Sequence, residues 1–129
     1  MQLIIDFGSE RPIYQQIRDA IVTGIATGEL KNDEVLPSVR ALAGEIGINL
    51  HTVNKAYRLL QSEGFIEIQR SRGTRVKAGE AAKDAASFLE TTGEALQMLV
   101  SEAITRHVDR AALHRMIDNL YEKLEGESS

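Results

Sequence analysis

The segment from Leu36 to Val76 constrains the fold of this chain more than any other part. Two short helical patterns are joined there by a tight turn at Gly47, and two strand-like pieces follow around the basic tip Arg70–Gly73. A link this short forces the two helices to cross at a steep angle. The order helix, turn, helix, hairpin predicts a winged helix-turn-helix, which presents its second helix to a groove of DNA.

The spacing of apolar residues and the capping residues predict where the N-terminal helices begin and end. A first helix is expected from Pro12, which suits a first turn, to about Ala26, with Gly28 as its stop. Ser38 and Asn49 are expected to cap the next two helices, because their side-chain oxygens can accept an unpaired backbone N–H. The inward face of the third helix is predicted to comprise Val53, Ala56, Tyr57 and Leu60.

The hairpin is predicted from alternation of apolar and polar residues. Residues 65–69 alternate as a strand does, and residues 74–76 can pair back against them. Gly73 is free to take the positive φ that a hairpin turn needs. Val35 and Leu36 are interpreted as apolar anchors within a loop.

The C-terminal part is predicted to form two amphipathic helices, one from about Glu80 to His107 and one capped by Asp109. Two such helices alone cannot bury both apolar stripes, so a second copy of the chain is the economical partner. The residues expected at this dimer contact are Phe88, Leu89, Leu96, Leu99, Ala103, Leu113, Met116, Ile117, Leu120, Tyr121 and Leu124. The predicted fold is therefore mainly α with a small β-hairpin: a DNA-binding domain over residues 1–77 and a helical dimerisation tail over 78–129.

The distribution of charge supports this division, although the net charge of -4 is unusual for a nucleic-acid binder. Residues 38–77 carry seven basic and three acidic side chains, a local charge of +4. Residues 78–129 carry five basic and ten acidic side chains, a local charge of -5. Because attraction to phosphate depends on the local patch, the acidic total does not argue against DNA binding.

The third helix, the start of the second and the hairpin tip hold the candidate DNA contacts. Asn and Arg can make bidentate contacts to adenine and guanine, while Lys and Arg also meet the phosphate backbone. The alternative for each is an ordinary solvated polar face. The candidate residues are Ser38, Arg40, Asn49, His51, Thr52, Asn54, Lys55, Arg58, Arg70, Arg72, Gly73 and Arg75.

Other classes of function find no support in the sequence. The three histidines lack the spacing of a metal-binding motif, there is no cysteine, and no phosphate-binding loop or catalytic constellation occurs. No enzyme, metal or cofactor is therefore expected. No apolar run approaches the roughly 18 residues of a membrane span and no cleavable leader is evident, so a cytoplasmic protein without a membrane partner is expected.

Five segments of the chain resemble the GntR family of bacterial transcription regulators. They read PIYQQIRDAI (12–21), GEL (28–30), LPSVRALA (36–43), INLHTVNKAYRLLQSEGFIE (48–67) and RGTRV (72–76). PSVR together with TVNKAY is most similar to the YtrA subfamily, which has a short two-helix tail. The resemblance implies a homodimer that binds a palindromic operator, usually as a repressor. It places Arg40, His51, Thr52, Asn54 and the wing around Arg72–Gly73 on the DNA-contacting positions.

Two questions remain open from the sequence. A winged-helix module that binds protein, with an incidental basic face, is the alternative to a sequence-specific DNA binder. Whether a small-molecule effector acts on the chain is also undecided. Salt dependence distinguishes the DNA binder from the protein-binding module, because DNA binding weakens steeply as salt displaces the protein from phosphates.

Overall fold

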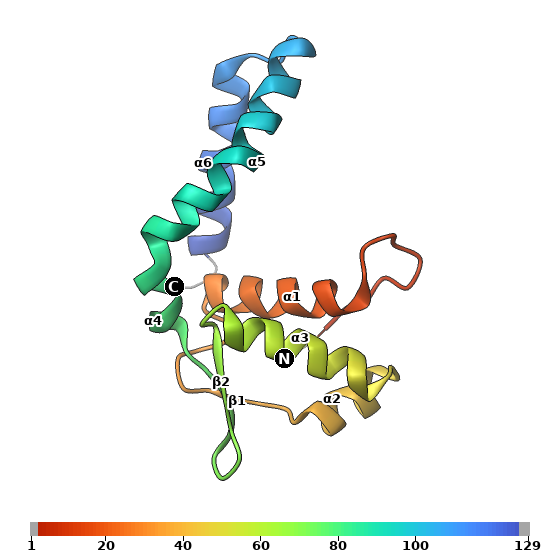
Figure 1. The fold of residues 1–129 in the computed structure, drawn as a ribbon. Coiled ribbons are helices and arrows are strands. Elements are labelled where there is room, and N and C mark those ends of the chain that lie inside the picture. The colour runs from red at the N-terminus through yellow and green to blue at the C-terminus, as the bar shows by residue number, and fades with distance from the viewer. Residues whose placement is uncertain (1–2, 127–129) are drawn as a thin grey trace.

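The computed structural model describes residues 3–126, with the backbone alone for residues 80–82. A compact lower part carries a projecting pair of helices (Figure 1). The elements in order are α1 (Ile13–Thr27), β1 (Val35–Leu36), α2 (Val39–Ile46), α3 (Leu50–Ser62), β2 (Ile66–Gln69), β3 (Gly73–Val76), α4 (Ala78–Ala81), a 3₁₀ turn (Ala82–Asp84), α5 (Ala85–Thr105) and α6 (Arg110–Gly126). The predicted fold class, mainly α with a small antiparallel sheet, is confirmed.

The sheet has three strands in the order β1-β3-β2, all antiparallel. The predicted hairpin is confirmed, with Ile66 opposite Val76 and Gln69 opposite Gly73. The assignment of residues 35–36 to a loop was wrong, because they pair with Thr74 and Arg75 as β1. Two residues are too few for strand alternation to show in a sequence, so only the pairing reveals this strand.

The core of the lower part lies between α1, α2, α3 and the sheet. The predicted inward face of α3 is confirmed, since Val53, Ala56, Tyr57 and Leu60 have no exposed surface. They pack with buried residues from every neighbouring element: Ile17, Ile21, Leu30, Leu36, Leu42, Ala43, Ile66 and Val76. This packing fixes the outward face of α3 by default, because a helix that buries one stripe presents the opposite one to solvent.

The predicted turn residues occupy the expected conformations. Gly47 ends α2 with φ of 79°, and Gly73 lies in the hairpin with φ of 76°. At both places the chain must turn through a left-handed conformation that glycine adopts without steric cost. Ser38 and Asn49 cap α2 and α3 as predicted, accepting hydrogen bonds from the amides of Ala41 (3.1 Å) and His51 (2.8 Å).

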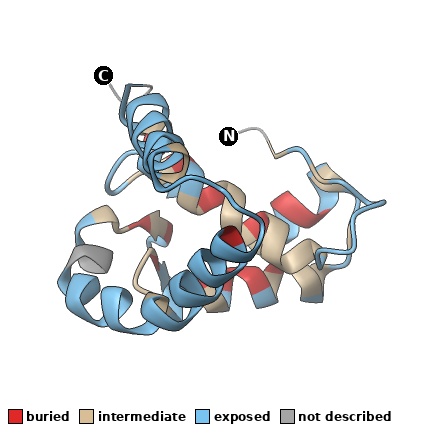
Figure 2. Ribbon diagram, turned by 90° about the horizontal axis from the view of Figure 1, so that it is seen from above, coloured by how far each residue is buried: buried red, intermediate tan, exposed pale blue. Residues whose placement is uncertain are grey.

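The tail departs from the sequence prediction at its start. The long helix was expected from about Glu80, but α5 begins at Ala85 after the short α4 and a 3₁₀ turn. Helix α6 packs against α1, whereas close approaches between the backbones of α5 and α6 are few. Most residues of α5 and α6 are therefore exposed in the single chain (Figure 2).

Tyr57 is the largest fully buried side chain, and its burial predicts how stability depends on pH. Burial raises the pKa of the Tyr57 phenol above its ordinary value of 10.0. The folded protein keeps this proton where the unfolded chain releases it, so stability should fall as pH rises above 10.0. We expect Tyr57→Phe to lose less stability between neutral and alkaline pH than the wild type does, as measured by urea unfolding. If both proteins lose the same free energy of unfolding at alkaline pH, the loss comes from groups other than Tyr57.

Candidate nucleic-acid interface

The crossing of α2 and α3 is held by contacts at both ends of α2. The amides of Gly47 and Ile48 donate to the carbonyl of Ala43 (2.9 and 3.0 Å), which closes α2 and starts the turn. At the other end, the Tyr57 hydroxyl donates to the carbonyl of Pro37 (2.7 Å), which ties α3 to the residue before the α2 cap. The outer face of α3 is therefore presented at a fixed angle to α2, as a recognition helix must be.

The outward residues of α3 form a mixed polar and basic surface. His51, Lys55 and Arg58 are exposed, while Thr52 and Asn54 are partly buried. Amide, hydroxyl and imidazole groups of this kind can contact base edges, and the two cations can contact phosphate. The structure thus places all five candidates of α3 away from its fully buried stripe.

Lys55 has a neighbour that sequence reasoning missed. Its ammonium lies 4.1 Å from the centre of the Tyr14 ring on α1, well within the range of a cation–π interaction. This contact holds the cation beside α3 without neutralising it. The signal in the sequence was weak, because the pair is separated by about forty residues and only the packing of α1 on α3 brings it together.

Two of the candidates, Ser38 and Asn49, have a second use for their side chains. Both are exposed, and both already accept a backbone hydrogen bond as helix caps. They mark the first turns of α2 and α3, where backbone N–H groups are directed outward and favour an anion. Arg40, in the first turn of α2, is also exposed.

The three arginines of the hairpin differ in exposure. Arg70 and Arg72 at the tip are exposed, and Gly73 next to them is exposed as well. Arg75 is different, because it is partly buried and its Nη1 donates to the carbonyl of Asp33 (2.9 Å). Arg75 therefore lies at the base of the hairpin with its guanidinium engaged by the chain itself, while the two tip arginines extend beyond it.

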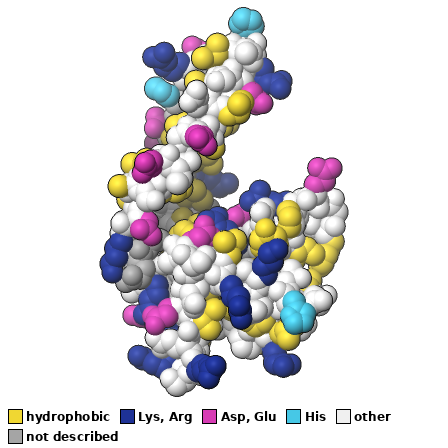
Figure 3. Space-filling model, in the orientation of Figure 1, with side chains coloured by type: hydrophobic (Ala, Val, Ile, Leu, Met, Phe, Trp, Pro, Cys, Tyr) yellow, Lys and Arg dark blue, Asp and Glu magenta, His cyan; other side chains and the backbone are white. Residues whose placement is uncertain are grey.

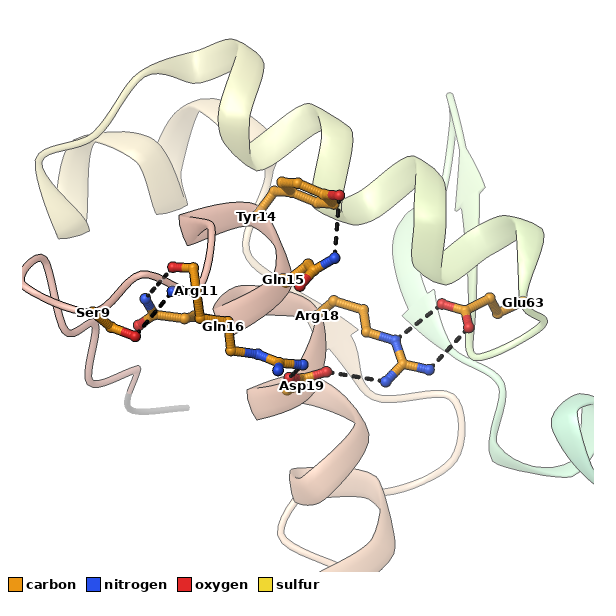
Figure 4. Close-up of polar contacts among 8 residues, drawn as sticks. All are labelled: Ser9, Arg11, Tyr14, Gln15, Gln16, Arg18, Asp19 and Glu63. Carbon is orange, nitrogen blue, oxygen red and sulfur yellow. Dashed lines mark hydrogen bonds and ion pairs between the residues drawn. The ribbon is translucent and has the colours of Figure 1, made fainter. Parts of the chain in front are cut away.

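Two arginines, Arg18 on α1 and Arg11 just before it, are paired with acids and do not join the candidate surface. Arg18 forms a bidentate pair with Glu63, with Nε–Oε1 at 3.0 Å and Nη2–Oε2 at 2.9 Å, and also contacts Asp19 (Figure 4). Arg11 pairs with the same Asp19. The pKa of Arg18 is raised, chiefly by its hydrogen bond to Glu63. This network joins α1 to the end of α3, so its role is structural.

The arginines of α2, α3 and the hairpin tip are instead unpaired. Within residues 3–126, Arg40, Arg58, Arg70 and Arg72 form no hydrogen bond or ion pair through their guanidinium groups. Lys and Arg side chains are correspondingly visible across the lower part of the molecule, on the side shown in Figure 3. A surface of unneutralised guanidinium groups around a fixed helix is suited to a polyanion with grooves.

Neither a metal site nor a membrane-spanning helix is found in the described part of the chain. No group of three or more metal-binding side chains occurs among the residues searched. No helix of residues 3–126 is long and apolar enough to span a membrane.

Comparisons with known proteins agree with this reading of the surface. Residues 13–76 match the family model described as bacterial regulatory proteins, gntR family. The HTH-type transcriptional repressor YtrA of Bacillus subtilis is 34% identical over 122 residues, which cover 95% of this chain and 94% of that protein. These relatives are transcription regulators and not enzymes.

Two solved structures extend the similarity to the fold. YtrA from Sulfolobus acidocaldarius, described as a GntR-family transcription factor, is 40% identical with a TM-score of 0.63, and the match covers 80% of this chain and 97% of that one. A chain described as a transcriptional antiterminator from Listeria monocytogenes EGD-e is 26% identical with a TM-score of 0.87, covering 97% of this chain and 93% of that one. The second match includes the tail helices and so supports their arrangement.

Proposed function

The chain belongs to the GntR family of bacterial regulatory proteins, and from this premise we propose that it is a cytoplasmic, sequence-specific repressor that binds a palindromic operator as a homodimer. Helix α3 of each protomer would enter a major groove, and the hairpin would contact the flanking backbone or minor groove. The two half-sites would then lie about one helical turn of DNA apart. The observation that carries the proposal is the set of unpaired arginines on α2, α3 and the hairpin tip of an otherwise acidic chain.

The tail supports the homodimer because most of its large apolar side chains remain exposed within the single chain. Only Ala103 of α5, and no residue of α6, is buried in the described tail. Between the two helices lies a groove of about 680 Å³, and the residues that line it are Leu96, Leu99, Val100, Ala103, Ile104, Val108, Arg110, Leu113, His114, Met116, Ile117 and Leu120. A groove this apolar is costly to leave in water.

A second copy of the tail is the occupant that the groove favours. Helices α5 and α6 can each pack against a helix of a partner protomer, in a four-helix arrangement that buries both apolar stripes. Two-fold symmetry of the protein then matches the two-fold symmetry of a palindromic operator. Residues 1–77 are proposed as the DNA-binding domain and 78–129 as the dimerisation tail.

Selection of binding sites from random duplex DNA tests the function directly. The full chain should enrich a palindromic sequence, and footprinting should protect two half-sites. Its affinity for that sequence should fall linearly in a plot of log K against log[salt], because counterions are released from each neutralised phosphate. Failure to enrich any sequence, with binding that is absent even at low salt, would favour a protein-interaction module instead.

Arg40 is the residue of α2 that we expect to contact the operator. Arg40→Ala should weaken operator binding by about 1–3 kcal/mol if the guanidinium reads a base, with a loss that depends on the base at one position of each half-site. Arg106→Ala, which removes an equal charge at the end of α5, is the matched control and should leave the affinity unchanged. Equal affinities of Arg40→Ala and wild type across several salt concentrations would remove Arg40 from the interface.

A further inference from the structure

Asp33 is held in an unusual backbone conformation beside the hairpin. Its φ is +66°, a left-handed value that costs a side-chain-bearing residue free energy which glycine would not lose. It lies in the loop before β1, where its amide donates to the carbonyl of Val76 (2.8 Å) and the amide of Val76 donates to Glu34 (3.0 Å). These bonds continue the β1–β3 pairing by one step and bring Asp33 against the base of the hairpin.

Asp33 contacts two cations, Arg75 on β3 and Lys77 directly after it, through its carbonyl and its side chain. Asp33 Oδ1 lies 2.6 Å from Lys77 Nζ, and the Asp33 carbonyl accepts the hydrogen bond from Arg75 Nη1 (2.9 Å). Lys77 also lies 3.8 Å from Glu67 Oε2 on β2, so one cluster joins the loop to both strands. Lys77 lowers the pKa of Asp33, and Asp33 raises the pKa of Lys77, so both groups remain charged around neutral pH.

Burial of Arg75 confirms that its guanidinium is committed to the base of the hairpin. Arg75 Nε is buried without a hydrogen-bond partner among the described residues, and so is Gln69 Oε1. The register places both on the same face of the hairpin, as diagonal neighbours across β2 and β3. Arg75 Nη1 is engaged by the Asp33 carbonyl and Arg75 Nε is shielded from solvent, so neither atom is open to a phosphate.

The tip of the hairpin depends on this base for its position. Strand β1 pairs only with Thr74 and Arg75, so the last pair of the hairpin, Gln69 with Gly73, and the turn residues 70–72 lie beyond it. Arg72 is three residues from Arg75, about 10 Å along a strand. A small rotation at the base therefore moves the tip arginines by ångströms.

We propose that Asp33 is a positioning residue for DNA binding: it anchors Arg75 and Lys77, and thereby places Arg70 and Arg72 against the DNA. This inference rests on the proposed function. It assigns a role to a residue outside the helix-turn-helix. It also separates the four basic residues on and next to the hairpin, Arg70, Arg72, Arg75 and Lys77, into two pairs. Two of them hold the hairpin, and the two at the tip contact the DNA.

A double-mutant cycle on the full-length protein tests the proposal, with the operator that the wild type selects. Asp33→Asn keeps a side chain tolerant of positive φ and removes the charge. It should weaken operator binding roughly three- to tenfold, in the range of coupling between contacting residues. In a chain that already carries Arg70→Ala and Arg72→Ala, the same substitution should have no further effect. Glu90→Gln, an equal charge change on α5, is the control.

Salt dependence separates positioning from simple charge neutralisation. If Asp33 positions the tip, Asp33→Asn loses phosphate contacts, and the slope of log K against log[salt] becomes shallower by about 0.9 for each one. A steeper slope with tighter binding would mean that Lys77, freed from the carboxylate, binds phosphate, which would overturn the proposal. A loss that persists in the chain without the tip arginines would also overturn it.

A second variant at the same position keeps the test decisive. Asp33→Gly removes the carboxylate while relieving the backbone, so it should fold at least as well as Asp33→Asn and show the same loss of affinity. If the wild type binds its operator and both variants bind it equally well, the inference alone fails. If the wild type selects no sequence, the proposed function fails and the inference fails with it.

Discussion

Leu99→Glu should convert the protein from a dimer into a monomer and weaken operator binding by roughly 100-fold or more, since linked sites gain that much from simultaneous engagement. Leu99 lines the apolar groove between α5 and α6 and is 49% exposed in the single chain, so the monomer has little need of it. In a dimer it would be covered, and a carboxylate there would be desolvated without a partner. Sedimentation at micromolar concentration should give twice 14.2 kDa for the wild type and 14.2 kDa for the variant.

A control on the same helix separates the apolar face from a general effect of charge. Gln97→Glu introduces the same carboxylate two residues away, at an exposed position outside the groove. It should leave both the mass and the affinity unchanged. A wild type that sediments as a monomer, or a Leu99→Glu variant that remains a dimer with full affinity, would contradict the proposed arrangement of the tail.

Local patterns in the sequence were sufficient for most of the fold. The stripe of α3, the caps Ser38 and Asn49, and the turn glycines Gly47 and Gly73 each depend on a few neighbouring residues, so periodicity and capping rules identify them. Strand β1 depends on a partner about forty residues away, and its two residues show no pattern of their own. The start of α5 was also misplaced, because residues 80–86 are rich in alanine, which favours helix, and contain no glycine or proline to mark a break.

The candidate interface was predictable as a set of residue types and less so as a set of contacts. Sequence reasoning gathered Arg70, Arg72 and Arg75 by their charge and spacing. It could not distinguish the engaged Arg75 from the unpaired tip, because the group that engages Arg75 is the backbone carbonyl of Asp33. Backbone partners of this kind depend on tertiary pairing, and so does the contact between Tyr14 and Lys55.

Tyr57→Ala should destabilise the protein by about 3–5 kcal/mol, the usual cost of truncating a buried aromatic side chain. Tyr57 has no exposed surface, and it contributes both volume to the core and a hydroxyl that donates to the Pro37 carbonyl at 2.7 Å. Since a small domain is stable by only about 5–15 kcal/mol, urea unfolding should show a large part of the total lost. Operator binding should fall with it, because the same side chain sets the angle between α2 and α3.

Tyr57→Phe divides these two contributions. It keeps the ring in the core and removes only the hydroxyl, so it should cost about 1–2 kcal/mol, the effect of leaving a carbonyl without its hydrogen bond. If the tie to Pro37 matters for presenting α3, operator affinity of Tyr57→Phe should fall even where the protein is fully folded. A Phe variant with wild-type affinity would show that packing alone fixes the crossing, and a Tyr57→Ala variant within about 1 kcal/mol of wild type would show that the core tolerates the cavity.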